Sequence, residues 1–409
     1  MNRTTTPAPL RVALVSEHAS PLAALGGPDA GGQNVYVAQL AGHLAALGHE
    51  VVVHTRRDDP GLPERVGTQD GYTVAHVPAG PPESVPKDEL ARWMPDFGDH
   101  LARDWAARRP DVAHAHFWMS GLAALRGATG LDLPVLQTYH ALGTVKRRHQ
   151  GAADTSPPQR IAAETDIGRR CRRVLATCAD EADELDAMGV PADRVRIVPC
   201  GVDPAHFAPR PRRPRSEPRL LAVGRLVPRK GFDRAIRALA LVPGAELVIA
   251  GGPEPALLHD DPEAERLRKL AAEHGVADRV RLLGAVSHDA MPELMSDADL
   301  VLSTPVYEPF GIVPLEAMAC ATPVVATAVG GQLDTVVDDR TGLLLPPDTE
   351  DAALADTLRG LLADPDRLER YGAAGRERVL RQFTWERVAE QVARVYADAL
   401  APAPTGAVR

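Results

Sequence analysis

Two carboxylates stand eight residues apart in the stretch EPFGIVPLE, which covers residues 308–316 and is otherwise apolar. Glu308 follows an apolar strand pattern, and Glu316 falls inside the helix predicted at 312–321. Pro314 fits the first turn of that helix, where a missing N–H costs little. Carboxylates accept hydrogen bonds from sugar hydroxyls, and one can hold both hydroxyls of a ribose. The stretch therefore predicts a site for a polyhydroxylated ligand, with a pair of capping or ion-paired acids as the structural alternative.

A second group of reactive residues lies in VGRLVPRKG, residues 223–231. Arg225 ends a predicted strand, and Lys230 follows five residues later. The forked guanidinium and the compact ammonium could together neutralise a diphosphate, a task that other enzymes give to a metal ion. Taken singly, the two residues would be ordinary surface charges.

A glycine-rich loop, GGPDAGG at residues 26–32, separates the first predicted strand from the first predicted helix. Gly31 and Gly32 would let the backbone approach a phosphate where the helix presents its free N–H groups. The loop lacks the G-x-G-x-x-G spacing of dinucleotide folds, and the next strand ends in Arg56 and Arg57 instead of an acid. A nicotinamide-phosphate oxidoreductase remains an alternative because arginines suit that cofactor.

The elements that must position these residues repeat in two halves of the chain. Apolar runs at 10–17 and 219–226 are each followed by glycine, a helical pattern and a second apolar strand at 50–56 or 245–252. Such alternation predicts an α/β protein with two doubly wound, Rossmann-like domains facing a central cleft.

The predicted boundaries follow from the proline-rich and charged stretch at 206–218. We expect an N-terminal domain at 1–205, a Pro/Arg-rich linker at 206–218 and a C-terminal domain at 219–383. The final helical pattern, at 384–409, is expected to cross back to the first domain.

Composition limits the class of protein. The chain has 409 residues, 44% of them hydrophobic, a formal net charge of −9 and four scattered cysteines. These values predict a two-domain globular enzyme with reduced thiols and argue against a general nucleic-acid surface. The apolar run near the N-terminus is interrupted too early for a signal peptide or a membrane span. We therefore expect a cytoplasmic protein without membrane insertion, for which a homodimer is one option.

Taken together, the motifs resemble the retaining glycosyltransferases of family four, which have the GT-B fold. EPFGIVPLE matches their E-x7-E motif, and GGPDAGGQNVYV, VGRLVPRKG and VVATAVGGQLDTVVDDRTGLLLPP resemble family segments in the same order along nearly the whole chain. HAHFWMSG, HALGTVK and ADTSPPQR resemble the branch that transfers N-acetylglucosamine to inositol phosphate in mycothiol synthesis, and sucrose-phosphate synthases are more distantly similar. The resemblance implies a bacterial hexosyltransferase that is metal-independent and uses no cofactor besides its nucleotide sugar, with UDP favoured and GDP possible.

The resemblance also implies roles for particular residues of this chain. The implied catalytic residues are His140, Arg225, Lys230 and Glu308. The implied donor-binding residues are Gly31, Gly32, Arg225, Lys230, Glu308, Phe310, Gly311, Ile312 and Glu316. The implied acceptor-binding residues are Asn34, Lys87, Phe117, Ala141 and Arg160.

The acceptor is where this chain departs from the inositol-phosphate branch. Lys87 and Arg160 match two of the four residues that hold the acceptor phosphate there, but Phe117 and Ala141 replace a tyrosine and a threonine. Two lost hydrogen bonds to a charged group would weaken binding about a hundredfold. We therefore expect a small hydroxyl- or thiol-bearing acceptor, such as one of specialised metabolism, with D-inositol 3-phosphate as the alternative.

No residue is predicted to be a covalent nucleophile, so we expect front-face substitution in which the leaving diphosphate helps to deprotonate the acceptor. Three rival classes are a metal-dependent transferase that uses the DAD sequence at 297–299, a nucleotide-sugar epimerase and a non-catalytic binding protein. His114 and His116 share one strand face, which suggests either a metal pair or packing at the floor of the cleft, and we favour packing. No metal site is predicted.

Overall fold

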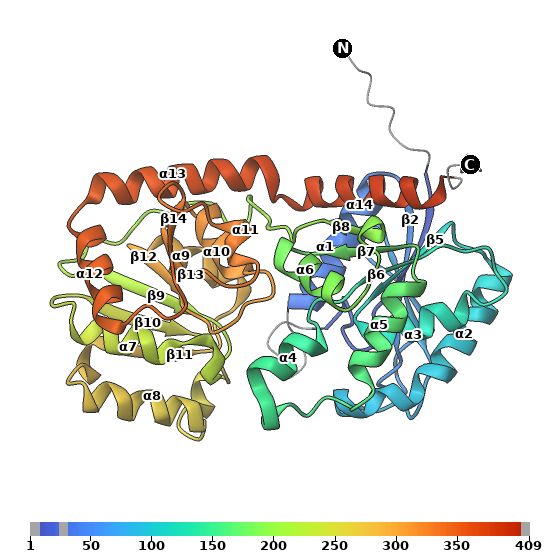
Figure 1. Ribbon diagram of the computed structural model, residues 1–409, viewed down its shortest axis with the longest axis horizontal. Helices are drawn as coiled ribbons and strands as arrows, with labels where there is room; N and C mark the ends of the chain where they lie inside the picture. Colours follow the sequence, from blue (N-terminus) through green and yellow to red (C-terminus); the bar gives the residue numbers. More distant parts are fainter. Residues whose placement is uncertain (1–8, 24–31, 402–409) are drawn as a thin grey trace, which may run out of the picture. The chain divides into compact units, whose positions relative to one another are not determined.

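The computed structural model describes residues 9–23 and 32–401, which divide into two compact units (Figure 1). The first unit ends at Pro199 and resumes at Trp385, and the second runs from Cys200 to Thr384. Both are doubly wound α/β domains, as the sequence predicts. The chain thus enters the second unit from the first and returns to it through its last helix.

The first unit is built on a sheet of eight described strands in the order β3-β4-β2-β1-β5-β6-β7-β8. All neighbouring pairs are parallel except β3 with β4. Apolar side chains fill both faces; Val12, Leu14, Val53 and Val74, for example, are buried. The strands are β1 (Arg11–Val15), β2 (Glu50–Arg56), β3 (Arg65–Gly67), β4 (Thr73–Val77), β5 (Val112–His116), β6 (Val135–Thr138), β7 (Arg173–Ala176) and β8 (Val195–Ile197).

Helices cover this sheet and supply the rest of the first core. The amphipathic helix α14 carries a buried stripe that includes Val388, Val392 and Tyr396, and its first residue, Trp385, packs edge-to-face on Tyr36 of α1. The α-helices are α1 (Gly32–Ala46), α2 (Met94–Ala107), α3 (Trp118–Gly127), α4 (Gly143–Gln150), α5 (Arg160–Arg170), α6 (Ala179–Ala187) and α14 (Trp385–Leu400). The short 3-10 helices are η1 (Lys87–Trp93), η2 (Gly151–Ala153) and η3 (Ala192–Arg194).

The second unit has a sheet of six described strands in the order β11-β10-β9-β12-β13-β14, with all neighbouring pairs parallel. The strands are β9 (Arg219–Val223), β10 (Glu246–Ala250), β11 (Val280–Gly284), β12 (Leu300–Ser303), β13 (Val324–Thr327) and β14 (Gly342–Leu345). The α-helices are α7 (Phe232–Ala240), α8 (Pro262–Glu273), α9 (Met291–Ser296), α10 (Ile312–Ala319), α11 (Gln332–Thr335), α12 (Asp351–Leu362) and α13 (Pro365–Gln382). The 3-10 helices are η4 (Pro228–Lys230), η5 (Pro255–Leu257), η6 (Ala277–Arg279) and η7 (His288–Ala290).

The segment predicted as a linker, residues 206–218, lies within the second unit, whose boundary at Cys200 precedes it. Ion pairs attach the segment: Arg215 Nη2 lies 3.0 Å from Asp299 Oδ2, and Arg213 pairs with Glu293. The proline-rich pattern correctly indicates irregular backbone, because residues 206–218 contain no helix or strand. The segment is nevertheless not a free connection between the units, because two of its arginines pair with acidic residues about 80 positions away in the chain.

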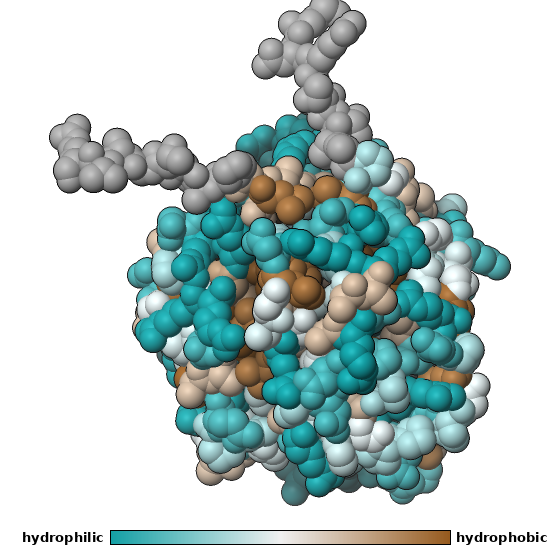
Figure 2. Space-filling model, turned by 90° about the vertical axis from the view of Figure 1, so that its right-hand side faces the viewer, coloured by the Kyte–Doolittle hydropathy of each residue, from teal (hydrophilic) through white to brown (hydrophobic). Residues whose placement is uncertain are grey.

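Hydrophilic residues cover most of the face shown in Figure 2, and hydrophobic residues appear there only in small patches. Within the described ranges, no helix is both long and apolar enough to cross a membrane.

Candidate active site

Both sheets place the predicted site residues where the strand order reverses. In each unit the chain runs outward from a central strand and then restarts on the other side of it, at β1/β5 and at β9/β12. Ligands of doubly wound sheets bind beyond the carboxyl ends of the strands at such points. Lys230 and Glu308 follow β9 and β12, whereas His18 and Phe117 follow β1 and β5.

A glycine ties the loop that carries Lys230 to the neighbouring strand. Gly231 has a φ of 69°, and a Cβ there would overlap the carbonyl oxygen of Thr304, just beyond β12. The Thr304 hydroxyl also donates to the Gly231 carbonyl at 3.0 Å. Only glycine allows this approach, which brings the loop beside the turn containing Glu308.

Lys230 and Glu308 form an ion pair in which Nζ lies 2.5 Å from Oε2. Both side chains are only 15% exposed, and Arg229 lies 4.0 Å from the same carboxylate. Arg225 is also partly buried; burial and the nearby Arg229 lower the pKa of its guanidinium, although Glu308 opposes this. The structure thus gathers the three residues at one edge of the sheet, and an anionic ligand there would find concentrated positive charge.

The turn before α10 is held by a second close approach between backbones. Glycines at positions 330 and 331 lie against Glu308 and Phe310, where a Cβ would overlap the backbone. The Gly331 N–H donates to the Glu308 carbonyl at 3.1 Å. The sequence analysis quoted this glycine pair only within a resembling segment and assigned it no role. The doubled glycine is visible in the sequence, but the local sequence does not show that it packs against the backbone of Glu308 and Phe310.

Gly311 caps α10 in a left-handed conformation, with a φ of 89°. Ile312 begins the helix, Phe310 is buried, and Pro314 occupies the first turn, as predicted. The free N–H groups at this end of α10 favour an anion. Further along α10, burial raises the pKa of Glu316 to about 8, so this carboxyl holds its proton at neutral pH.

In the first unit, two residues with strained backbone end adjacent strands. Phe117 after β5 has a φ of 79°, and His140 after β6 has a φ of 62°. Such values are rare for large side chains and concentrate at functional sites. His140 is partly exposed, and its Nε2 lies 3.1 Å from Nδ1 of His116. Burial, with smaller effects from His114, His18 and Lys87, lowers the pKa of His140 to about 3, so its imidazole is neutral.

His114 has a packing role, as the sequence analysis favoured. Its Nδ1 lies 2.9 Å from the hydroxyl of Tyr396 in α14, and its Nε2 lies 2.9 Å from Thr138 Oγ1. Both ring nitrogens are therefore engaged, which leaves neither lone pair for a metal ion.

Two of the predicted acceptor residues, Lys87 and Arg160, lie against the ring of a third, Phe117. The Lys87 ammonium is 4.0 Å from the ring centroid, and the Arg160 guanidinium carbon is 5.0 Å from it. Arg160 is mostly committed: its Nε donates to Glu164 at 2.7 Å and its Nη2 to the Ala141 carbonyl at 2.7 Å. Asn34 of α1 is buried and donates to the Ser20 carbonyl at 3.0 Å. The structure therefore groups two cations with Phe117 and Ala141.

Gly32 is the first residue of α1 and is exposed. Gly31 lies outside the described residues.

Sequence reasoning missed a buried pair beside Phe117. Glu17 and His18 follow β1 after Ser16, and Glu17 Oε1 lies 2.6 Å from His18 Nδ1. The Ser120 hydroxyl donates to the other Glu17 oxygen. The signal was the acid and histidine that interrupt the first apolar run, which the sequence analysis used only to argue against a signal peptide.

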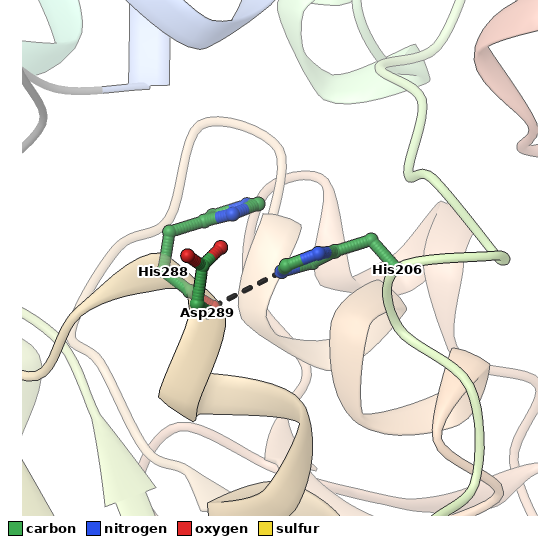
Figure 3. Close-up of side chains that lie close together, drawn as sticks. All are labelled: His206, His288 and Asp289. Carbon is green, nitrogen blue, oxygen red and sulfur yellow. Dashed lines mark hydrogen bonds between the residues drawn. The ribbon is translucent and has the colours of Figure 1, made fainter.

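The carboxylates of the DAD sequence have a structural role. Asp297 and Asp299 of the DAD sequence pair with Arg215 and Arg219. In the described residues, the group with metal-ligand spacing is His206, His288 and Asp289. Its imidazole rings stack 4.0 Å apart at an interplanar angle of 12°, and Figure 3 shows His206 Nε2 bonded to the His288 carbonyl. Ring lone pairs lie in the ring planes, so two nearly parallel rings do not direct them at one ion.

Comparisons with known proteins agree with this fold. Residues 30–206 match the model described as Glycosyltransferase Family 4, and residues 206–378 match that described as Glycosyl transferases group 1. The chain is 39% identical to a D-inositol 3-phosphate glycosyltransferase of Acidothermus cellulolyticus over 98% of this chain and 93% of the relative. It is 38% identical to the Kineococcus radiotolerans enzyme of the same name, over 95% of each chain.

Solved structures show the same architecture. A sucrose-phosphate synthase from Thermosynechococcus elongatus superposes with a TM-score of 0.86 at 34% identity, covering 95% of this chain and 98% of that one. Anabaena HepE in complex with UDP-glucose shares the fold, with a TM-score of 0.73 at 19% identity over 95% of this chain and all of that one. The fold is that of a GT-B glycosyltransferase. The chain belongs to glycosyltransferase family 4.

Proposed function

We propose that this protein transfers a sugar from a nucleoside-diphosphate sugar to a small anionic acceptor, with retention of anomeric configuration and without a metal ion. The grouping of Arg225, Lys230 and Glu308 at the end of β9 and β12 carries the donor half of the proposal. Two cations beside a helix N-terminus can stabilise the charge that develops on a departing diphosphate. A UDP-sugar is the favoured donor.

In this proposal Lys230 exchanges partners when the donor binds. In the free protein its ammonium is paired with Glu308. A donor phosphate would take over the ammonium, and the released Glu308 carboxylate would accept hydrogen bonds from the sugar. Glu316, protonated at neutral pH because burial raises its pKa to about 8, can both donate to and accept from ribose hydroxyls.

D-inositol 3-phosphate is the first acceptor to test. Relatives at 34–39% identity over nearly the whole chain carry that acceptor in their names, which favours the alternative of the sequence analysis over its main expectation. Lys87 and Arg160 both contact the Phe117 ring, and two cations at one place are consistent with an anionic acceptor. Transfer of N-acetylglucosamine from its UDP donor to this acceptor, followed by product mass, tests the proposal.

A second candidate acceptor is an uncharged hydroxyl or thiol compound. Phe117 and Ala141 offer no side-chain hydroxyl to a phosphate, and Arg160 is already bonded to Glu164 and the Ala141 carbonyl. A panel of cyclitols, sugars and thiols, run beside D-inositol 3-phosphate, separates the candidates. Release of an epimerised donor without any acceptor would instead indicate an epimerase.

Metal independence has its own test. We expect transfer to continue at an unchanged rate in excess EDTA, because Arg225 and Lys230 supply the positive charge that a metal ion would otherwise bring. Strict dependence on added magnesium or manganese would contradict this part of the proposal.

A further inference from the structure

We propose that the first unit has a second ligand site, a cavity at the amino ends of β6, β7 and β8 that binds a small organic anion with a phosphate or carboxylate group. The site is separate from the candidate active site, because Phe117 and His140 lie beyond the carboxyl ends of β5 and β6, at the opposite edge of the same sheet. The inference goes beyond the proposed function, since it concerns a ligand other than the donor and the acceptor.

The cavity has the size and the mixed wall of a small-molecule site. Its volume is about 550 Å³, which lies within the range that small ligands occupy in proteins. It lies where α3 ends and where the chain enters three neighbouring strands, so segments from four elements enclose it. Leu125, Leu133 and Pro134 contribute apolar surface to the wall. An organic ligand can therefore place an apolar part against these side chains.

The charged part of the lining is mainly positive. It includes four arginines and an acidic residue, Asp193. Two of the arginines have carboxylate partners: Arg170 Nη1 lies 3.0 Å from Asp166 of α5, and Arg173 Nη2 lies 2.8 Å from Asp398 of α14. The other two arginines form no ion pair within the described residues. Their charge is therefore not neutralised by a neighbouring side chain.

These two arginines, Arg172 and Arg194, are bonded to backbone carbonyls and keep further donors. Arg172 Nε and Nη2 donate to the carbonyls of Ala399 and Ala401, each at 3.3 Å, and Arg194 Nη1 donates to carbonyls of the 169–171 segment. In the part of the chain that the structure describes, Nη1 of Arg172 and both Nε and Nη2 of Arg194 have no hydrogen-bond partner. Guanidinium N–H groups are well suited to the oxygens of phosphate and carboxylate. An anion is thus the ligand that this lining favours.

A buried thiol shows that two of the cations lie close together. Cys171 lines the cavity and is fully buried, and burial raises the pKa of its thiol to about 12. The charges of Arg170 and Arg194 oppose this rise only in part. The thiol is therefore neutral at pH 7 and unreactive, so the cavity is suited to binding and not to covalent chemistry. Because both guanidinium groups act on the same sulfur, they lie near one part of the wall.

Calorimetric titration of the full chain with phenyl phosphate, and separately with benzoate, tests the inference. Each probe joins an anionic group to an apolar ring, and we expect saturable binding of at least one of them. The same Kd is expected for the double variant Lys87→Ala/Lys230→Ala, which removes an ammonium group from each half of the candidate active site. A bound probe should also raise the Tm of the chain, because it stabilises the native state.

A series of charge variants assigns the binding to the cavity. Arg170→Ala and Arg194→Ala should each weaken binding about tenfold or more, because each removes a charged donor. Asp193→Asn should instead tighten it several-fold, because the carboxylate repels an anion. Arg126→Ala is the matched control: Arg126 of α3 is 51% exposed and paired with Asp99, as Arg170 is 54% exposed and paired, but it lies outside the cavity. The control should keep the wild-type Kd.

Three results would each overturn the inference. They are failure of both probes to bind, wild-type affinity in both Arg170→Ala and Asp193→Asn, and loss of binding in Lys87→Ala/Lys230→Ala, which would place the probe in the candidate active site. Arg170 and Asp193 are both exposed, so their variants should fold even if Arg194→Ala does not. The titration needs no sugar transfer, so its result is independent of the proposed function.

Discussion

Lys230 is the side chain on which the donor half of the proposed reaction depends most. Its ammonium is 15% exposed and already holds a carboxylate 2.5 Å away, so the loop presents it in a fixed position. Arg225 stands beside it with a guanidinium whose pKa burial lowers. Such preorganised cations lose little further freedom when a diphosphate arrives.

We expect Lys230→Ala and Arg225→Ala each to lower kcat/KM by roughly 10- to 100-fold, because a charge-assisted hydrogen bond contributes about 1.5–3 kcal/mol. Lys269→Ala removes an exposed lysine from α8 of the same unit and should leave kcat/KM unchanged. Steady-state kinetics with a UDP-sugar provide the measurement. Wild-type values in both site variants would remove these residues from the donor site.

Glu316 predicts a pH dependence of stability. Burial raises its pKa from an ordinary 4.5 to about 8, so the native state binds this proton more tightly than the unfolded chain. The free energy of unfolding should therefore fall as pH rises from about 4.5 to about 8. Glu316→Gln cannot ionise, so across that window its free energy of unfolding should lose less than that of the wild type, by on the order of 1.4 kcal/mol for each pH unit. Equal free energies of unfolding of the wild type at pH 5 and pH 8, measured by denaturant titration, would contradict the raised pKa of Glu316.

The elements that carry the donor residues meet through glycine. At the end of η4, Gly231 touches the backbone after β12, and the pair at 330 and 331 touches the turn before α10. In each case two backbones lie closer than any side chain permits. These contacts bring the donor residues, which follow different strands, close to one another.

Gly231→Ala should therefore destabilise the protein and lower activity together, because the added Cβ displaces the loop that carries Lys230. Gly275→Ala is a matched control: its φ of 68° is almost the same as the 69° of Gly231, but nothing lies within 4 Å of the added Cβ. We expect the control to cost about 1 kcal/mol of unfolding free energy and to keep its kcat. Equal losses of stability and activity in both variants would mean that backbone strain alone explains the effect.

Considered as a whole, the chain makes its first unit depend on its last helix. Residues up to Pro199 form most of that unit, yet Trp385 packs on Tyr36, and Tyr396 reaches His114 across 282 positions of sequence. The helix carries Val388 and Val392, both buried completely. The first unit is thus completed only after the second has been synthesised.

We expect Val392→Ala to lower the free energy of unfolding by about 1–3 kcal/mol, because it removes buried apolar surface and leaves a cavity. Leu380→Ala on α13 removes a side chain that is 42% exposed and should have a much smaller effect. Deleting the chain from Trp385 should abolish cooperative unfolding of the first unit. A truncated protein that melts like the full chain would show that α14 is dispensable.

The amino-acid sequence by itself determined the two doubly wound domains, because helical and strand periodicities reflect local burial. It also indicated that Arg225, Lys230 and Glu308 lie beyond the carboxyl ends of strands, the edge at which ligands of such sheets bind. Tertiary structure alone decided the partners: Glu17 with Ser120, Arg160 with Glu164, and the DAD carboxylates with Arg215 of the 206–218 segment. Whether a charge faces a ligand or a neighbour depends on contacts made after the elements pack, and no local pattern of residues records those contacts.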